Sequence, residues 1–186
     1  AITLLEPKLT RPARDVHNDV LEFFKGRFTN LQGNAYPHDV IDATIAAGFD
    51  DLVSCEARIK AVDIFRQRDD YAPLLATFKR VGNIVKEEVD APVDPSLFTD
   101  EAEHTLYRVL QETRSAALAK VASQDYLEAL TIIAGLKWAV DAFFDAVMVM
   151  SEDQAVRMNR LALLTVVQHI FLKVADFSRL TASVAP

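Results

Sequence analysis

The chain has 186 residues, 51% of them hydrophobic, and a formal net charge of −7. This apolar content can build the core of one large domain or of two small ones, and it argues against disorder. The acidic balance argues against a protein that coats nucleic acid by bulk attraction, so any RNA contact must be local.

The apolar pattern also excludes membrane and secretory classes. No apolar run reaches the roughly 20 residues that cross a bilayer, and the first residues lack the basic-then-apolar order of a secretory signal. Cys55 is the single cysteine, so an intramolecular disulfide and a cysteine-rich zinc site are impossible. We therefore expect a cytoplasmic protein that has neither a membrane nor DNA as a partner.

We interpret residues 1–11, which begin without Met, as a leader or linker of an excised fragment, and residues 12–186 as the helical domain. Pro12 can occupy an early position of the first helix, which is expected to end before Gly33.

The next two helices have clear start and stop residues. Pro37 starts a short helix that Gly48 stops. Asp50 and Asp51 precede a third apolar pattern, which continues to Phe65.

A proline-bearing segment divides the middle of the chain. Pro73 begins the fourth helix, which runs to Val85. Residues 87–98 are acidic and contain prolines, so they are the candidate for an internal linker. Thr99 can then cap a fifth helix with apolar residues as far as Val121.

The last third contains two further helical patterns. Asp125 can open a sixth helix that continues to Val140. Ser151 and Gln154 have the spacing of a capping box at the start of the last helix, whose apolar stripe continues to Val174. The pattern as a whole predicts an all-α bundle of about six to seven helices.

Two patterns resemble metal sites, and each has a simpler explanation. Glu101 and His104 have the spacing of a di-iron helix, but the motif occurs only once, so we interpret it as an acidic helix start. His38 and Asp39 resemble the metal pair of HD hydrolases, but no other histidine lies in a matching motif. A role for Asp39 at the start of a helix is favoured, and no metal site is predicted.

Catalytic and nucleotide-binding patterns are equally weak. Asp141 and Asp145 lie one turn apart and could act as an acid and a base, but structural use is favoured. Cys55 has no histidine near it in the sequence and is interpreted as a buried thiol. The lone Gly82 is not a phosphate-binding loop, so we predict no catalytic residue and no ATP site.

Local basic and amide side chains are the candidates for RNA contacts. Guanidiniums can bind phosphate and stack on unpaired bases, while amides can bond to base edges. The candidates are Lys79, Arg80, Asn83, Lys86, Arg157, Asn159 and Arg160, with Arg58, Lys60, Arg66, Arg68 and Tyr71 as further basic or stacking residues. Arg157 and Arg160 lie one turn apart and have an alternative role, which is to neutralise Asp141 or Asp145 across the bundle.

The C-terminal third carries a family resemblance. The order of Asp, Phe and Met in Val140–Met150 is not required by an apolar helix, and this region resembles the C-terminal end of the beta subunit of bacterial glycyl-tRNA synthetase. The likeness covers roughly residues 20–180 and is most specific at Val140–Met150. The other stretches that carry it are His38–Leu52, Phe78–Lys86, Asp94–Phe98, Arg157–Leu164 and Val174–Ser178.

This resemblance implies a helical domain similar to the anticodon-binding domain of arginyl-tRNA synthetase, the DALR domain. It also implies recognition of the anticodon arm of tRNA-Gly, with ATP- and Mg-dependent glycylation on a separate alpha subunit. The expected partners are tRNA-Gly, the alpha subunit and the rest of the beta subunit, and this piece alone is not expected to be catalytic. The alternative is a helical subunit-interaction or scaffold domain without RNA contact.

Overall fold

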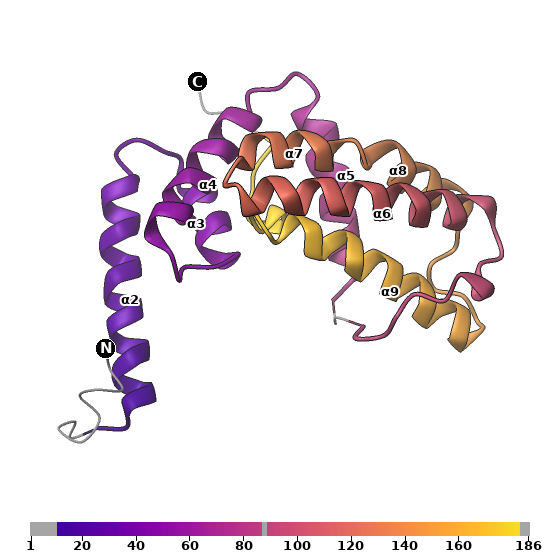
Figure 1. Cartoon of the computed structure of the whole chain (residues 1–186), viewed down its shortest axis with the longest axis horizontal. Coiled ribbons are helices and arrows are strands. Elements are labelled where there is room, and N and C mark those ends of the chain that lie inside the picture. The colour runs from indigo at the N-terminus through magenta and orange to yellow at the C-terminus, as the bar shows by residue number, and fades with distance from the viewer. Residues whose placement is uncertain (1–10, 87–88, 183–186) are drawn as a thin grey trace.

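The computed structural model describes residues 11–86 and 89–182, and every regular element in these ranges is a helix (Figure 1). The elements are α2 (Ala13–Gln32), α3 (His38–Ala46), α4 (Leu52–Phe65), α5 (Tyr71–Ile84), η2 (Pro95–Leu97), α6 (Glu101–Ala122), α7 (Tyr126–Ala134), α8 (Lys137–Ala146), α9 (Gln154–Phe171) and η3 (Phe177–Arg179). The all-α prediction is confirmed. Residues 1–10 of the predicted leader, and residues 87 and 88 of the predicted linker, lie outside the described ranges.

Proline and aspartate start the N-terminal helices as the sequence predicts. Pro12 and Pro37 directly precede α2 and α3. Asp51 caps α4, because its carboxylate accepts hydrogen bonds from two N–H groups of the first turn. Gly48 follows α3 with a φ of 147°, a conformation that other residues rarely adopt.

Two predicted helix starts are displaced. α5 begins at Tyr71, two residues before Pro73, because a proline fits anywhere in a first turn whose N–H groups have no helical partner. The cap of α6 is Asp100 and not Thr99. Asp100 and Glu103 form a capping box, and the N–H of Thr99 also donates to Glu103 at 2.8 Å.

The predicted sixth helix, from Asp125 to Val140, is divided into α7 and α8. The N–H groups of Gly135 and Leu136 bond to carbonyls three residues earlier, at 3.1 and 3.0 Å. A new helix begins after this tight turn, and its apolar side continues to face the core, since Leu136 is fully buried. Hydrophobic periodicity therefore did not reveal the break.

The capping box predicted from Ser151 and Gln154 is wrong. α9 starts at Gln154 with Asp153 as its cap, and the Asp153 carboxylate accepts hydrogen bonds from the N–H groups of Ala155 and Val156. Asp153 is adjacent to the first helical residue, so it reaches these groups directly.

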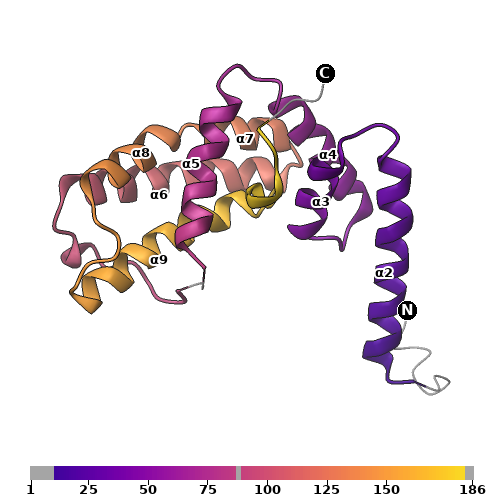
Figure 2. The ribbon, with the colours of Figure 1, turned by 180° about the vertical axis from the view of Figure 1, so that it is seen from behind.

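The bundle places α5 and α6 on opposite sides. α6 packs against α7, α8 and α9, and α5 crosses the other side of the bundle against α8 and α9, where it lies in front in Figure 2. Phe78 of α5, Phe171 of α9 and Phe177 of η3 form an aromatic cluster with ring centroids 4.0 to 5.6 Å apart. This cluster fixes α5 on the bundle and turns its polar side outward.

The segment after α9 returns to α3 and joins the N-terminal helices to the bundle. Buried Arg58 of α4 donates to three backbone carbonyls, including that of Val174 at 3.2 Å. Asp39 accepts hydrogen bonds from Arg66 and from both the N–H and the hydroxyl of Thr181. Asp39 therefore also links α3 to α4 and to the segment after α9.

Candidate RNA interface

The outer face of α5 gathers the first group of predicted RNA ligands. The apolar residues of this helix are buried against the bundle, and the three- and four-residue spacing leaves Arg80 and Asn83 together on the outer side. Lys86 follows the end of the helix and is exposed, whereas Lys79 is half-buried.

Arg80 lies over an aromatic ring of the neighbouring helix. Its guanidinium carbon is 4.2 Å from the ring centroid of Phe144 in α8, within cation–π range. Phe144 is buried and Arg80 is exposed, so the ring supports the guanidinium while the rest of the group remains accessible. A guanidinium plane held in this way can stack on an unpaired base.

A carboxylate balances part of this basic charge. Asp141 of α8 accepts hydrogen bonds from the Thr77 hydroxyl at 2.7 Å and from the Lys137 ammonium. Burial raises the pKa of Asp141, but these hydrogen bonds, with the charges of Lys137 and Arg80, hold it below its ordinary value. The ion-pair partner of Asp141 is thus Lys137, and the predicted pairing with Arg157 or Arg160 is wrong for this carboxylate.

Trp138 is a candidate that sequence reasoning missed. It is the single tryptophan of the chain, and 56% of it is exposed, on α8 next to Lys137. Exposed aromatic side chains provide stacking surfaces for unpaired bases. The sequence could have indicated that Trp138 is exposed, because this residue lies outside the apolar stripe that contains Leu136 and Val140.

Lys86 borders a surface cavity of about 520 Å³ between the end of α5 and α9. Exposed Met150 and Met158 lie on the far side of this cavity. Thioether side chains adapt to flat apolar groups, so a base could enter here beside the Lys86 ammonium.

Arg157, at the start of α9, is half-buried. Its Nη1 donates to the carbonyl of Ser151 at 2.7 Å, which secures the turn before the helix. One guanidinium nitrogen is therefore engaged within the fold.

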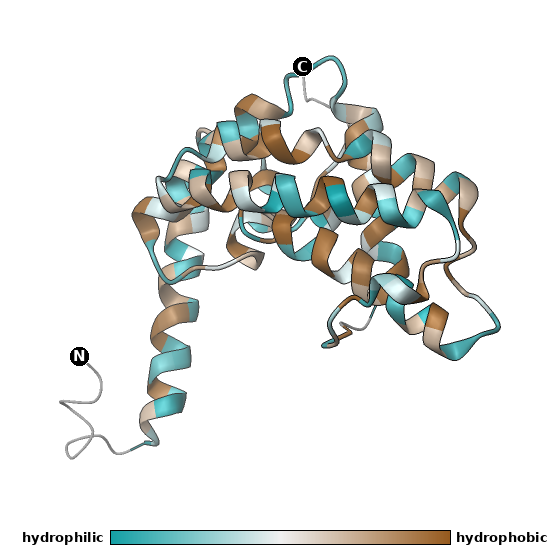
Figure 3. Ribbon diagram, turned by 45° about the vertical axis from the view of Figure 1, so that its right-hand side comes forward, coloured by the Kyte–Doolittle hydropathy of each residue, from teal (hydrophilic) through white to brown (hydrophobic). Residues whose placement is uncertain are grey.

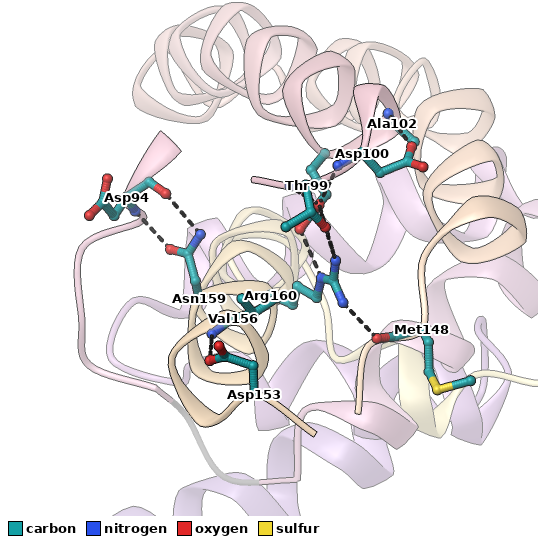
Figure 4. Close-up of polar contacts among 10 residues, drawn as sticks. Asp94, Thr99, Asp100, Ala102, Met148, Asp153, Val156, Asn159 and Arg160 are labelled. Carbon is teal, nitrogen blue, oxygen red and sulfur yellow. Dashed lines mark hydrogen bonds and ion pairs between the residues drawn. The ribbon is translucent and has the colours of Figure 1, made fainter. Parts of the chain in front are cut away.

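Asn159 and Arg160 serve internal contacts. Figure 4 shows Arg160 pointing from α9 toward Thr99 and the carbonyl of Met148, with Asn159 directed to the backbone of Asp94. The Asn159 amide donates to the Asp94 carbonyl at 2.9 Å and accepts from its N–H at 2.7 Å. With exposures of only 5% and 7%, these two side chains leave the set of RNA-facing candidates.

Arg160 also forms a bidentate pair with buried Glu103. Its Nε and Nη2 donate to the two carboxylate oxygens at 2.8 and 3.2 Å. Burial raises the pKa of Glu103, but the hydrogen bonds from Arg160 and from the N–H groups of Thr99 and Asp100 keep it below its ordinary value. This ion pair joins the start of α6 to α9, so one arginine of the predicted pair is structural.

Further basic or stacking candidates also lie inside the fold. Arg58 and Arg66 are buried and hydrogen-bonded to the N-terminal helices or the segment that returns to them. Tyr71 is 2% exposed, and burial raises its pKa to about 12. These side chains cannot present a surface to RNA without unfolding.

The residues of the predicted metal-like and thiol patterns do not form a common site in the described residues. His104 is exposed and its ring packs edge-on against Phe98 at 5.0 Å, while neighbouring Glu103 binds Arg160. Cys55 is fully buried, and burial raises the pKa of its thiol, as expected of a structural cysteine. Across residues 11–86 and 89–182, no three His, Cys, Asp or Glu side chains are grouped so that they could hold a metal ion.

In the same ranges, no helix has the length and apolar character of a transmembrane span.

The fold is a helical bundle in which α5 presents an exposed guanidinium packed on a ring of α8. Residues 74–177, from α5 to η3, match the family model of the DALR anticodon binding domain. The chain belongs to this family, and the resemblance seen in the sequence is confirmed.

Several glycine–tRNA ligase beta subunits match nearly the whole chain. The protein of Trichlorobacter lovleyi is 68% identical over 180 residues, which are 97% of this chain and 26% of that protein. Those of Geotalea daltonii and Geobacter metallireducens are 53% and 54% identical over 182 residues, again 26% of each. The chain thus spans about a quarter of the length of these relatives, in their C-terminal region.

Proposed function

We propose that this chain is the tRNA-recognition part of a glycine–tRNA ligase beta subunit, and that it contacts the anticodon arm of tRNA-Gly. The interface is the outer face of α5 with the adjoining part of α8. Its contact residues are Lys79, Arg80, Asn83, Lys86 and Trp138, and Arg157 lies at the start of α9 as a further basic residue.

The Arg80–Phe144 stack is the observation that carries this proposal. It lies inside the segment that matches the anticodon-binding family, and it holds an exposed guanidinium in a fixed position on an otherwise acidic protein. Anticodon loops expose unpaired bases, which proteins read by stacking and by hydrogen bonds to base edges. Asn83, one turn from Arg80, supplies such an amide.

In this proposal the chain contributes recognition, and the chemistry occurs elsewhere. ATP-dependent glycylation with Mg²⁺ takes place on the alpha subunit, which associates with the complete beta subunit. The cytoplasm, where tRNA is charged, is the location that this role implies.

The test is a binding titration with three RNAs: tRNA-Gly, tRNA-Gly with a substituted anticodon, and an unrelated tRNA. We expect tRNA-Gly to bind most tightly and the anticodon substitution to remove that preference. Arg80→Ala should weaken tRNA-Gly binding by about tenfold, since stacking contributes about 1–3 kcal/mol per base.

Arg108→Ala is the matched control. It removes the same charge from an exposed position of α6, where Arg108 lies 3.8 Å from Glu112. Equal effects of the two substitutions would show that only overall charge matters. Equally weak binding of all three RNAs would support the alternative, a helical interaction or scaffold domain without RNA contact.

A further inference from the structure

α2 carries a large apolar face that the described residues leave in solvent. Figure 3 shows this helix extending away from the bundle with hydrophobic bands along its length. We define the α2 apolar face as Val20, Phe23, Phe24 and Leu31, which are 41%, 58%, 50% and 68% exposed.

The C-terminal end of α2 anchors the helix to the rest of the chain. Its main helix neighbour is α3, and Phe28 packs edge-on against Phe49 in the loop after α3, with centroids 5.4 Å apart. Helices in proteins are stabilised chiefly by packing of their apolar side. Most of the apolar side of α2 lacks this packing in the described chain.

The apolar face continues onto the start of α4. A surface cavity of about 640 Å³ lies between the two helices, lined by Phe24, Arg27, Phe28, Asn30, Leu31 and Leu52. Leu52 and Val53 are themselves 46% and 71% exposed. Exposed apolar side chains grouped around a cavity, here with Arg27 and Asn30 among them, are typical of an interaction site.

Two comparisons show that α2 to α4 belong to the beta subunit and not to the anticodon-binding model. The anticodon-binding family model begins at residue 74, after α4, whereas the beta-subunit relatives match 97% or more of the chain. α2 to α4 are therefore common to these beta subunits and lie outside the part that the anticodon-binding model describes. The same relatives contain about three further quarters of sequence beyond the matched region.

The size of the face favours a tethered partner over a second copy. From Val20 to Leu31 the face is a strip about 17 Å long and about 10 Å wide, whereas separate chains that associate stably bury about 800 Å² on each side. A segment of the same polypeptide is present at a high effective concentration and can dock through a smaller surface.

We propose that the α2 apolar face docks against an apolar surface in the remaining part of the same beta-subunit polypeptide. α2 to α4 then orient the anticodon-binding bundle relative to the rest of the subunit. This inference rests on family membership and on the exposed face, and it does not depend on RNA binding by α5.

The test compares thiol labelling in two contexts. One is this chain alone; the other is the full-length Trichlorobacter lovleyi beta subunit in which this sequence replaces the matched region and other reactive cysteines are removed. Phe24→Cys and Leu31→Cys report on the apolar face. Asn18→Cys is the control, because it is exposed on the opposite side of α2, and native Cys55 is fully buried.

We expect labelling at both face positions to slow by about tenfold or more in the full-length subunit, while the control changes by less than about twofold. Hydrogen exchange of α2 in the unsubstituted proteins should show the same protection without any mutation. Both measurements are made without tRNA, so their outcome is separate from that of the binding titration.

Equally fast labelling in both contexts would show that the face stays exposed and would overturn the proposal. So would equal slowing of all three positions, because it would not be specific to the apolar face. Protection in the isolated chain that grows with protein concentration, together with a dimer in sedimentation, would assign the face to a second copy.

Discussion

At Arg160, the guanidinium and the carboxylate of Glu103 are both buried and share two hydrogen bonds. Removing one partner of such a pair leaves an uncompensated buried charge, which costs about 3–5 kcal/mol. We expect Arg160→Ala to reduce the free energy of unfolding by an amount in this range, measured by urea denaturation.

Arg157→Ala is the natural comparison, since Arg157 lies one turn away and is only half-buried. Arg157 donates one hydrogen bond to the Ser151 carbonyl, and the loss of that bond should cost about 1 kcal/mol. Similar losses for the two arginines would contradict the distinction between a structural Arg160 and a peripheral Arg157.

Glu103 also makes stability depend on pH. Its pKa is held below the ordinary value of 4.5 in the folded protein, so folding favours the ionised form. This stabilisation is fully present above the unfolded pKa and is lost as pH falls through the lower folded value. Glu103→Gln should reduce the fall in the free energy of unfolding that the wild-type protein shows as pH decreases. If the fall were unchanged in this variant, other carboxylates would be responsible for it.

At the scale of elements, the start of α9 gives a direct test of helix capping. Asp153→Ala removes the side chain that accepts hydrogen bonds from Ala155 and Val156, and should lower the free energy of unfolding by about 1 kcal/mol. Ser151→Ala should have little effect, because Ser151 contributes its backbone carbonyl to Arg157. If thermal or urea unfolding showed a larger loss of stability for Ser151→Ala than for Asp153→Ala, Ser151 would be the cap.

Element positions were predictable because their signals are local. Asp51 lies next to the helix that it caps, and Pro37 directly precedes its own. The break at Gly135 was not predictable from periodicity, since Leu136 continues the buried stripe across it. Local signals thus find the helices but not every interruption.

The candidate site was less predictable, because burial of a charged residue depends on partners far away in the chain. Arg160 lies four residues after Val156 and three before Leu163, which places it at the edge of the buried stripe of α9. Its carboxylate partner, Glu103, is 57 residues away in sequence. Periodicity could indicate the burial of Arg160, but not the residue that pairs with it.

At the scale of the whole molecule, a net charge of −7 coexists with a local basic face on α5. Under the proposed function, binding to tRNA-Gly depends on a few phosphate contacts from this face and not on the overall charge. About three contacts to a single-stranded loop predict a slope near −2 for log affinity against log salt, or about a twentyfold loss between roughly 50 and 200 mM.

Two neighbouring substitutions separate charge from hydrogen bonding at this face. Arg80→Ala should weaken binding and make the slope shallower by about 0.7, because under the proposal the stacked guanidinium also donates from its edge to one phosphate. Asn83→Ala, on the same side of α5, should weaken binding without changing the slope, since an amide releases no counterion. Affinity titrations across the salt range measure both effects, and a slope that Arg80→Ala leaves unchanged would place the phosphate contacts on another surface of the molecule.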